Sequence, residues 1–188
     1  MAKNKQKIAL LDLGGVVFQS TGSSNDVVRW NIISVLNHKY GYDLNVGKVS
    51  LEVFLEEYNA LTNQKLTGTA FLEAVFDTLA INEELIELIR HDHKIVIVSD
   101  NYQENIEYIS KRYDFSSWSI QQIYSYEYKM VKADPDFFRK LIEDLKDYDI
   151  KQMVFIDDSQ PKLDSAIKQG IRGILYKNNE QLKAALYR

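Results

Sequence analysis

Three short apolar runs in this chain each end on an acidic or hydroxyl side chain. They are ALLD, ending at Asp12, IVIVSD, ending at Ser99 and Asp100, and MVFIDD, ending at Asp157 and Asp158. Unbroken apolar runs of this length are typical of strands buried on both faces of a parallel sheet. Parallel strands present their carboxyl ends at one edge of a sheet, where ligands bind at the switch point in strand order. The sequence therefore predicts that these side chains gather in one cleft.

The order of the predicted elements indicates an α/β fold. From about residue 94 onward, apolar strands alternate with helical patterns, which predicts parallel βαβ units. Between the first two of the apolar runs lie three or four helical patterns and no convincing strand, more than one crossover needs. We therefore predict a doubly wound parallel sheet from residues 1–18 and 90–188, with a helical cap inserted at residues 19–89.

Local signals set several expected boundaries. Thr67 and Asn82 are expected to be helix N-caps. The tyrosine-rich segment from Gln121 to Tyr128 is expected to be a strand. Asp134 and Pro135 are expected to be the N-cap and first residue of the next helix.

The inserted segment offers few chemical signals. Its first helix is expected over residues 25–40, from the helical spacing of its apolar side chains. Trp30 and Phe54 are expected to form a small hydrophobic core, although either could shape a pocket. His38 is expected to be a half-exposed histidine at a helix end rather than the missing catalytic acid.

Composition excludes several classes of protein. The 188 residues carry a net charge of -4, with the two signs interspersed, so no basic stripe indicates nucleic-acid binding. No apolar run approaches the roughly 20 residues that cross a membrane. The absence of cysteine excludes disulfides and thiolate chemistry and is compatible with the cytoplasmic location that we expect. The expected partner is a small molecule, and the sequence does not indicate an oligomeric state.

The acidic strand ends predict a metal site. A single aspartate at a strand end could simply cap a helix, but Asp12, Asp157 and Asp158 together would repel one another unless a cation neutralised them. Oxygen ligands without cysteine or histidine indicate Mg²⁺. Gly14 and Gly15 allow the backbone to turn sharply and approach a ligand closely.

These motifs resemble the haloacid dehalogenase (HAD) superfamily of hydrolases, most of which are Mg²⁺-dependent phosphatases. Four segments match in order: LLDLGGVV around Asp12, IVIVSDN around Ser99, KMVKADPDFF around Lys132, and VFIDDSQ. In the third, Ala133 replaces the first proline of the usual Pro-x-Pro. The resemblance covers the whole chain and implies that the helical insertion is a C1-type cap, as in sugar-phosphate phosphatases of this family.

The resemblance also implies roles for individual residues. Asp12 would be the nucleophile that forms an aspartyl-phosphate, Ser99 would donate a hydrogen bond to a phosphoryl oxygen, and Lys132 would place a positive charge beside both. The implied metal ligands are Asp12, the main-chain carbonyl of Gly14, Asp158, and Asp157 directly or through water. The residues implied to surround the phosphate are Leu13, Gly14, Gly15, Asp100 and Asn101.

One position departs from the family pattern. The aspartate that usually serves as general acid/base, two residues after the nucleophile, is Gly14 here, and such catalysis is typically worth about 10²–10⁴-fold. The chain could be a phosphatase that uses a better leaving group, such as a sugar 1-phosphate, or an acid from the cap or substrate. It could instead bind phosphates with little turnover. It could also be a 2-haloacid dehalogenase, with Arg29 as the candidate cap cation. The pair Asp157-Asp158 favours a metal, and so a Mg²⁺-dependent phosphatase acting on a small phosphorylated metabolite.

Overall fold

The computed structural model describes residues 5–23 and 27–187. In these residues a five-stranded sheet has the order β5-β4-β1-β6-β7, and every neighbouring pair is parallel. The strands are β1 (Ile8–Leu11), β4 (Lys94–Ser99), β5 (Ser119–Tyr124), β6 (Met153–Asp157) and β7 (Arg172–Leu175). β1 lies at the centre with β4 and β6 on either side, so the three strands that end in acidic or hydroxyl residues are adjacent. The doubly wound parallel sheet predicted from the sequence is confirmed.

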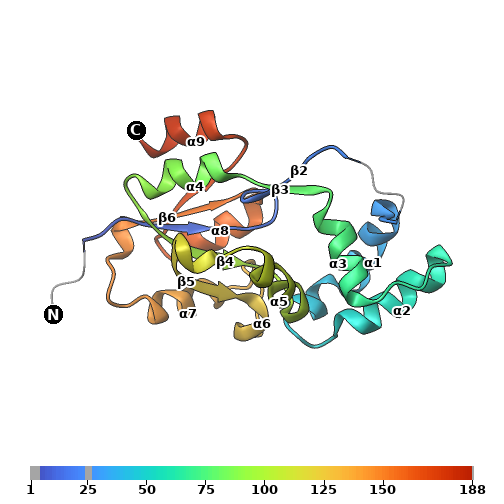
Figure 1. The fold of residues 1–188 in the computed structure, drawn as a ribbon. Helices are drawn as coiled ribbons and strands as arrows, with labels where there is room; N and C mark the ends of the chain where they lie inside the picture. The colour runs from blue at the N-terminus through green and yellow to red at the C-terminus, as the bar shows by residue number, and fades with distance from the viewer. Residues whose placement is uncertain (1–4, 24–26, 188) are drawn as a thin grey trace.

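Helices cover both faces of this sheet (Figure 1). One face packs against α4 (Glu83–Arg90), α5 (Gln103–Arg112) and α9 (Asn179–Leu186), and the other against α7 (Phe137–Asp144) and α8 (Gln160–Lys168). Along β1, Ala9 and Leu11 belong to the first of these cores, and Ile8 and Leu10 to the second. All four β1 residues are fully buried, which explains why the strand sequence is apolar throughout rather than alternating.

Three helices form a separate unit beyond one end of the sheet (Figure 1). This helical unit comprises α1 (Trp30–Asn45), α2 (Leu51–Thr62) and α3 (Gly68–Phe76), and it has a hydrophobic cluster of its own. The rings of Phe54, Tyr58 and Phe71 pack together at the centre of that cluster. The chain enters and leaves the unit through an antiparallel pair of strands, β2 (Phe18–Ser20) and β3 (Leu79–Ile81). Strands of three residues are too short to be recognised from periodicity.

Part of the predicted insertion, residues 19–89, packs against the sheet. Helix α4 lies inside that range, but Leu85, Ile86 and Ile89 are buried in the same cluster as the sheet residues, and the helix packs on β4 and α9. An amphipathic pattern reports that one helix face is buried without indicating which surface covers it. We therefore propose that the insertion begins and ends at the β2–β3 pair.

Two other expectations need correction. Strand β5 ends at Tyr124, and Tyr126 and Tyr128 lie in the short helix α6 (Ser125–Tyr128). Helix α7 begins at Phe137 with Asp136 at the N-cap position, two residues later than Asp134. Short 3₁₀ turns at Phe115–Ser117 and Ile150–Gln152 precede β5 and β6.

The predicted caps at Thr67 and Asn82 are confirmed, because their side chains accept hydrogen bonds from the N–H groups of Ala70 and Leu85. Helix α1 begins at Trp30, and residues 24–26, where its start was expected, lie outside the described residues. In the part of the chain that the structure describes, every helix is too short or too polar to cross a bilayer.

Candidate active site

The carboxyl ends of three adjacent strands deliver a cluster of carboxylates. Asp12 directly follows β1, Asp157 ends β6, and Asp158 comes next. One carboxylate oxygen from each of the three lies within 4.8 Å of the others. Asp12 and Asp157 are buried, whereas Asp158 is exposed. Ser99 is buried at the end of the neighbouring strand β4. The arrangement follows from the strand order, as the sequence predicts.

A buried lysine holds this cluster together. Lys132 lies in the loop between α6 and α7, and its Nζ atom is 2.7 Å from Oδ1 of Asp12 and 2.6 Å from Oδ2 of Asp157. The same ammonium group donates to the carbonyl oxygen of Val98, 3.2 Å away. The backbone N–H of Lys132 donates to Oδ1 of Asp100 at 2.7 Å. Through these contacts the lysine ties together the ends of β1, β4 and β6.

The surrounding carboxylates favour the charged form of Lys132, whereas the pKa of Asp12 is raised above its ordinary value, chiefly by burial. Burial alone would lower the pKa of Lys132, but the carboxylates of Asp12, Asp157 and Asp100 raise it above its ordinary value. Burial raises the pKa of Asp12, and the positive charge of Lys132 opposes that effect. The lysine is therefore a fixed positive charge at the strand ends rather than a group that exchanges its proton near neutral pH.

A second lysine, which the sequence analysis did not single out, also faces the nucleophile candidate. Lys162 lies in the first turn of α8, with its Nζ atom 3.8 Å from Oδ2 of Asp12 and 3.4 Å from Oδ2 of Asp100. Its side chain is 25% exposed, so it reaches the site from the solvent side. The signal in the sequence was its place in the first turn of a helix that starts directly after an acidic strand end.

The side chains of the site carry a net negative charge that a cation would neutralise. The four carboxylates of the site exceed its two ammonium groups by two; the carboxylates are Asp12, Asp100, Asp157 and Asp158, and the ammonium groups Lys132 and Lys162. A divalent cation would balance this excess, and hard oxygen donors are what Mg²⁺ prefers. The donor set and the charge of the described residues therefore fit the predicted metal.

The loop after β1 explains the glycine pair. Gly15 has a φ of +72°, and a Cβ atom there would lie 2.2 Å from Oδ2 of Asp158, so only glycine allows that carboxylate to approach the loop. Gly14 differs, since a Cβ atom built there meets nothing within 4 Å. The backbone at Gly14 is therefore open on its side-chain face.

Several amides expected to surround a phosphate already have partners. The N–H of Gly15 donates to the Phe18 carbonyl at 2.9 Å, and the N–H of Leu13 donates to Oδ1 of Asp12 at 2.8 Å. The N–H of Asn101 donates to Oγ of Ser125 at 2.9 Å. Because these three amides hold the loops in place, we do not assign them to phosphate binding.

Comparison with known proteins agrees with this arrangement. A family model described as haloacid dehalogenase-like hydrolase matches residues 27–176. The chain belongs to the HAD-like hydrolases. No match was found among curated proteins.

Solved HAD structures share the fold along their full length. One is a HAD family enzyme from Bacteroides thetaiotaomicron, 20% identical, with a TM-score of 0.74 over 98% of this chain and 100% of that one. The same enzyme in complex with magnesium and inorganic phosphate superposes with a TM-score of 0.72, at 20% identity over 97% and 100% of the two chains. A predicted HAD-like family hydrolase from Porphyromonas gingivalis is 19% identical, with a TM-score of 0.71 over 98% of both chains.

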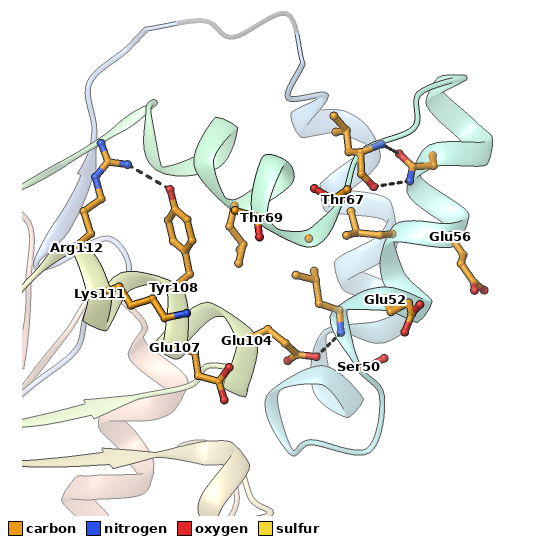
Figure 2. Close-up of a pocket in the computed structure, with 16 residues that line it drawn as sticks. Ser50, Glu52, Glu56, Thr67, Thr69, Glu104, Glu107, Tyr108, Lys111 and Arg112 are labelled. Carbon is orange, nitrogen blue, oxygen red and sulfur yellow. Dashed lines mark hydrogen bonds between the residues drawn. The ribbon is translucent and has the colours of Figure 1, made fainter.

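Two hollows lie near the junction of the helical unit and the core of this HAD-like hydrolase. The larger, a groove of about 950 Å³, runs between α2, α3 and α5 (Figure 2). Glu52 and Glu56 of α2 and Glu104 of α5 lie along it, and Glu104 accepts a hydrogen bond from the N–H of Leu51 at 3.1 Å. The three clustered aspartates are not among its lining residues. This groove is therefore separate from the candidate active site.

The smaller hollow is lined by the loop that directly follows Asp12, although the three clustered aspartates do not line it either. We call this space of about 210 Å³ the junction cavity; it is lined by Leu13 and Gly14 of the β1 loop, by Asn101 after β4, and by residues of the helical unit. Of the two expected core aromatics, Phe54 is buried, whereas Trp30 is 48% exposed, and both line this cavity. His38 is exposed and lies near the middle of α1, so the expected half-exposed position at a helix end is wrong; its Nδ1 atom is 3.0 Å from the Ser34 carbonyl oxygen.

Proposed function

We propose that this HAD-like hydrolase is a Mg²⁺-dependent phosphatase that hydrolyses a small phosphorylated metabolite through an aspartyl-phosphate at Asp12. The observation that carries the proposal is the convergence of Asp12, Asp157 and Asp158 within 4.8 Å, with Lys132 in contact with the first two. The structural neighbour solved with magnesium and inorganic phosphate supports it.

The residues that would hold Mg²⁺ are Asp12, Asp157, Asp158 and the main-chain carbonyl of Gly14. A bound Mg²⁺ supplies charge neutralisation and polarisation of the phosphoryl group. The excess of carboxylates over ammonium groups at the site and the all-oxygen donor set support this assignment.

The protein's own groups perform the remaining work. The Nζ atom of Lys132, 2.7 Å from Oδ1 of Asp12, holds that carboxylate in place. A carboxylate oxygen of Asp12 attacks phosphorus while the bond from phosphorus to the ester oxygen breaks. Water then attacks the phosphorus of the aspartyl-phosphate, which releases inorganic phosphate and restores Asp12. Ser99 and Lys162, both at the same edge of the sheet, are placed to bind phosphoryl oxygens.

Phosphate binding with little turnover is the second candidate function. Gly14 has no side chain to protonate the leaving group, and this absence alone could lower the rate by about 10²–10⁴-fold. The dehalogenase alternative has less support. Arg29, its candidate cation, is exposed and is not among the residues that line the junction cavity.

A panel of phosphomonoesters assayed with and without Mg²⁺, including anomeric sugar phosphates, tests the proposal beside an Asp12→Asn variant. Mg²⁺-dependent release of phosphate that Asp12→Asn abolishes is the expected result. A thermal shift with Mg²⁺ but no release from any ester would favour the binding function. Metal-independent release of chloride from a 2-haloacid would favour the dehalogenase.

A further inference from the structure

The junction cavity is uncharged and largely apolar. Aromatic side chains surround it, from the helical unit (Trp30, Phe54, Phe71 and Phe76), from β2 (Phe18) and from the N-cap position of α5 (Tyr102, which also carries a hydroxyl group). None of the described residues that line it carries a formal charge. Its volume of about 210 Å³ is below the roughly 300–1,000 Å³ of pockets for drug-sized ligands, so a group of about one ring fits.

The polar groups of the cavity are few and mostly paired. Oδ1 of Asn101 accepts from the N–H of Tyr102 at 3.0 Å and from Nδ2 of Asn105 at 2.7 Å. Oδ1 of Asn105 is buried and has no hydrogen-bond partner. A buried acceptor left unpaired costs about 1–3 kcal/mol, but this oxygen has almost no accessible surface, so it does not identify a group on a ligand. Asn37 is the remaining carboxamide of the lining, and it is exposed.

The neighbouring loop limits the chemistry of the leaving group. Gly14 lines the cavity and supplies no acid to protonate a departing oxygen. A phenol ionises near pH 10, as tyrosine does, which is several units below an aliphatic alcohol. A phenolic oxygen therefore leaves as a stable anion without the acid that an aliphatic alkoxide needs.

We propose, building on the phosphatase function above, that the junction cavity binds the uncharged aromatic leaving group of an aryl monophosphate. The carboxylate oxygen of Asp12 forms a bond to phosphorus, and the bond from phosphorus to the aryl oxygen breaks with its electron pair on that oxygen. The phenolate takes a proton from water after release, and water hydrolyses the aspartyl-phosphate to restore Asp12 and free inorganic phosphate.

The alternatives fit the cavity less well. A sugar would bury several hydroxyl groups among aromatic rings, and each unpaired hydroxyl costs about 1–3 kcal/mol. A leaving group with its own carboxylate or second phosphate would bury a charge without a cation among the described lining residues, which costs more.

Matched substrates separate these possibilities. Phenyl phosphate and 4-carboxyphenyl phosphate share a ring and differ in charge, and the carboxylated phenol leaves at least as readily. With Mg²⁺, we expect kcat/KM for phenyl phosphate to exceed that for 4-carboxyphenyl phosphate and for glucose 1-phosphate by at least about tenfold, which corresponds to about 1.4 kcal/mol. Trp30→Ala should lower the ratio of phenyl phosphate to acetyl phosphate hydrolysis, whereas Val35→Ala, at an exposed position on the same helix, should not.

Acetyl phosphate distinguishes the failure of this inference from failure of the proposed function, because its acyl leaving group needs neither an acid nor an aromatic cavity. If Asp12 is required for acetyl phosphate hydrolysis but phenyl phosphate has no advantage over the carboxylated ester, the cavity assignment is wrong and the phosphatase function stands. If none of these compounds is hydrolysed, the proposed phosphatase function and the cavity assignment are both wrong.

Discussion

The ammonium nitrogen of Lys132 lies 2.6 Å from Oδ2 of Asp157, and both side chains are fully buried. The same nitrogen is 2.7 Å from Oδ1 of Asp12. One buried cation therefore offsets two buried carboxylates that belong to different strands. We expect this contact to stabilise the fold as well as to serve the reaction, because burying an unpaired charge is costly.

Lys132→Met should destabilise the fold strongly. Removing one partner of a buried ion pair leaves an uncompensated charge and typically costs about 3–5 kcal/mol. Urea unfolding without Mg²⁺ measures the free energy of unfolding. Lys162→Met is the matched control, since Lys162 is partly exposed and its loss should cost no more than about 1 kcal/mol. Asp157→Asn should recover part of the loss in the Lys132→Met background, and equal losses for the two lysine variants would contradict the assigned role.

The adjacent glycines should respond differently to alanine. At Gly15 a Cβ atom would lie 2.2 Å from Oδ2 of Asp158 at a φ of +72°, so Gly15→Ala should displace that carboxylate and adopt a backbone conformation that costs about 1–2 kcal/mol. We expect the variant to lose most of its Mg²⁺-induced thermal shift.

Gly14→Ala is the control for this substitution, because a Cβ atom there meets nothing within 4 Å. It should keep the Mg²⁺-induced shift of the unmodified protein. Loss of the shift in both variants, or in neither, would show that Asp158 does not depend on Gly15.

Much of the site was predictable because it follows from strand order. Asp12, Ser99 and Asp157 stand at the ends of apolar runs, and a parallel sheet brings such ends to one edge. Lys132 could be placed only through the family motif, since it lies in a loop with no periodic signal. The sequence analysis did not identify Lys162. Its approach to Asp12 depends on the direction of α8 relative to the sheet, which helix propensities do not predict.

The helical unit was predicted less completely for a related reason. Helical periodicity located α4, but its partner surface is a property of the assembled fold, so Leu85 and Ile89 were assigned to the insertion instead of the core. The junction cavity likewise depends on the assembled fold, because residues of α1 and α3 line it together with Gly14. Trp30 is apolar yet 48% exposed, and only the assembled structure shows that it faces this cavity.

Stability should fall in mild acid through His93. Burial and then the positive charge of Lys7 lower the pKa of His93 below its usual 6.5, with Asp92 acting in the opposite direction. The unfolded chain therefore binds a proton at this residue more readily than the folded chain. The stabilisation is present above pH 6.5 and is lost as the pH falls below it.

Urea midpoints at pH 7.5 and pH 5 check this expectation. His93→Gln should show a smaller loss between the two pH values than the unmodified protein. An unchanged pH dependence in His93→Gln would assign the acid sensitivity to other groups.

Gly14→Asp should raise turnover in the proposed phosphatase reaction. The open space beside Gly14 can accept a carboxyl group, which would supply the missing acid two residues after Asp12. For an alkyl phosphate the gain should reach about 10²–10⁴-fold in kcat. For phenyl phosphate it should be much smaller, because a phenolate needs little help in leaving. Gly14→Asn, which has the same shape and no transferable proton, is the control. An equal gain with Gly14→Asn, or no gain with any alkyl ester, would show that the absent acid is not what limits the rate.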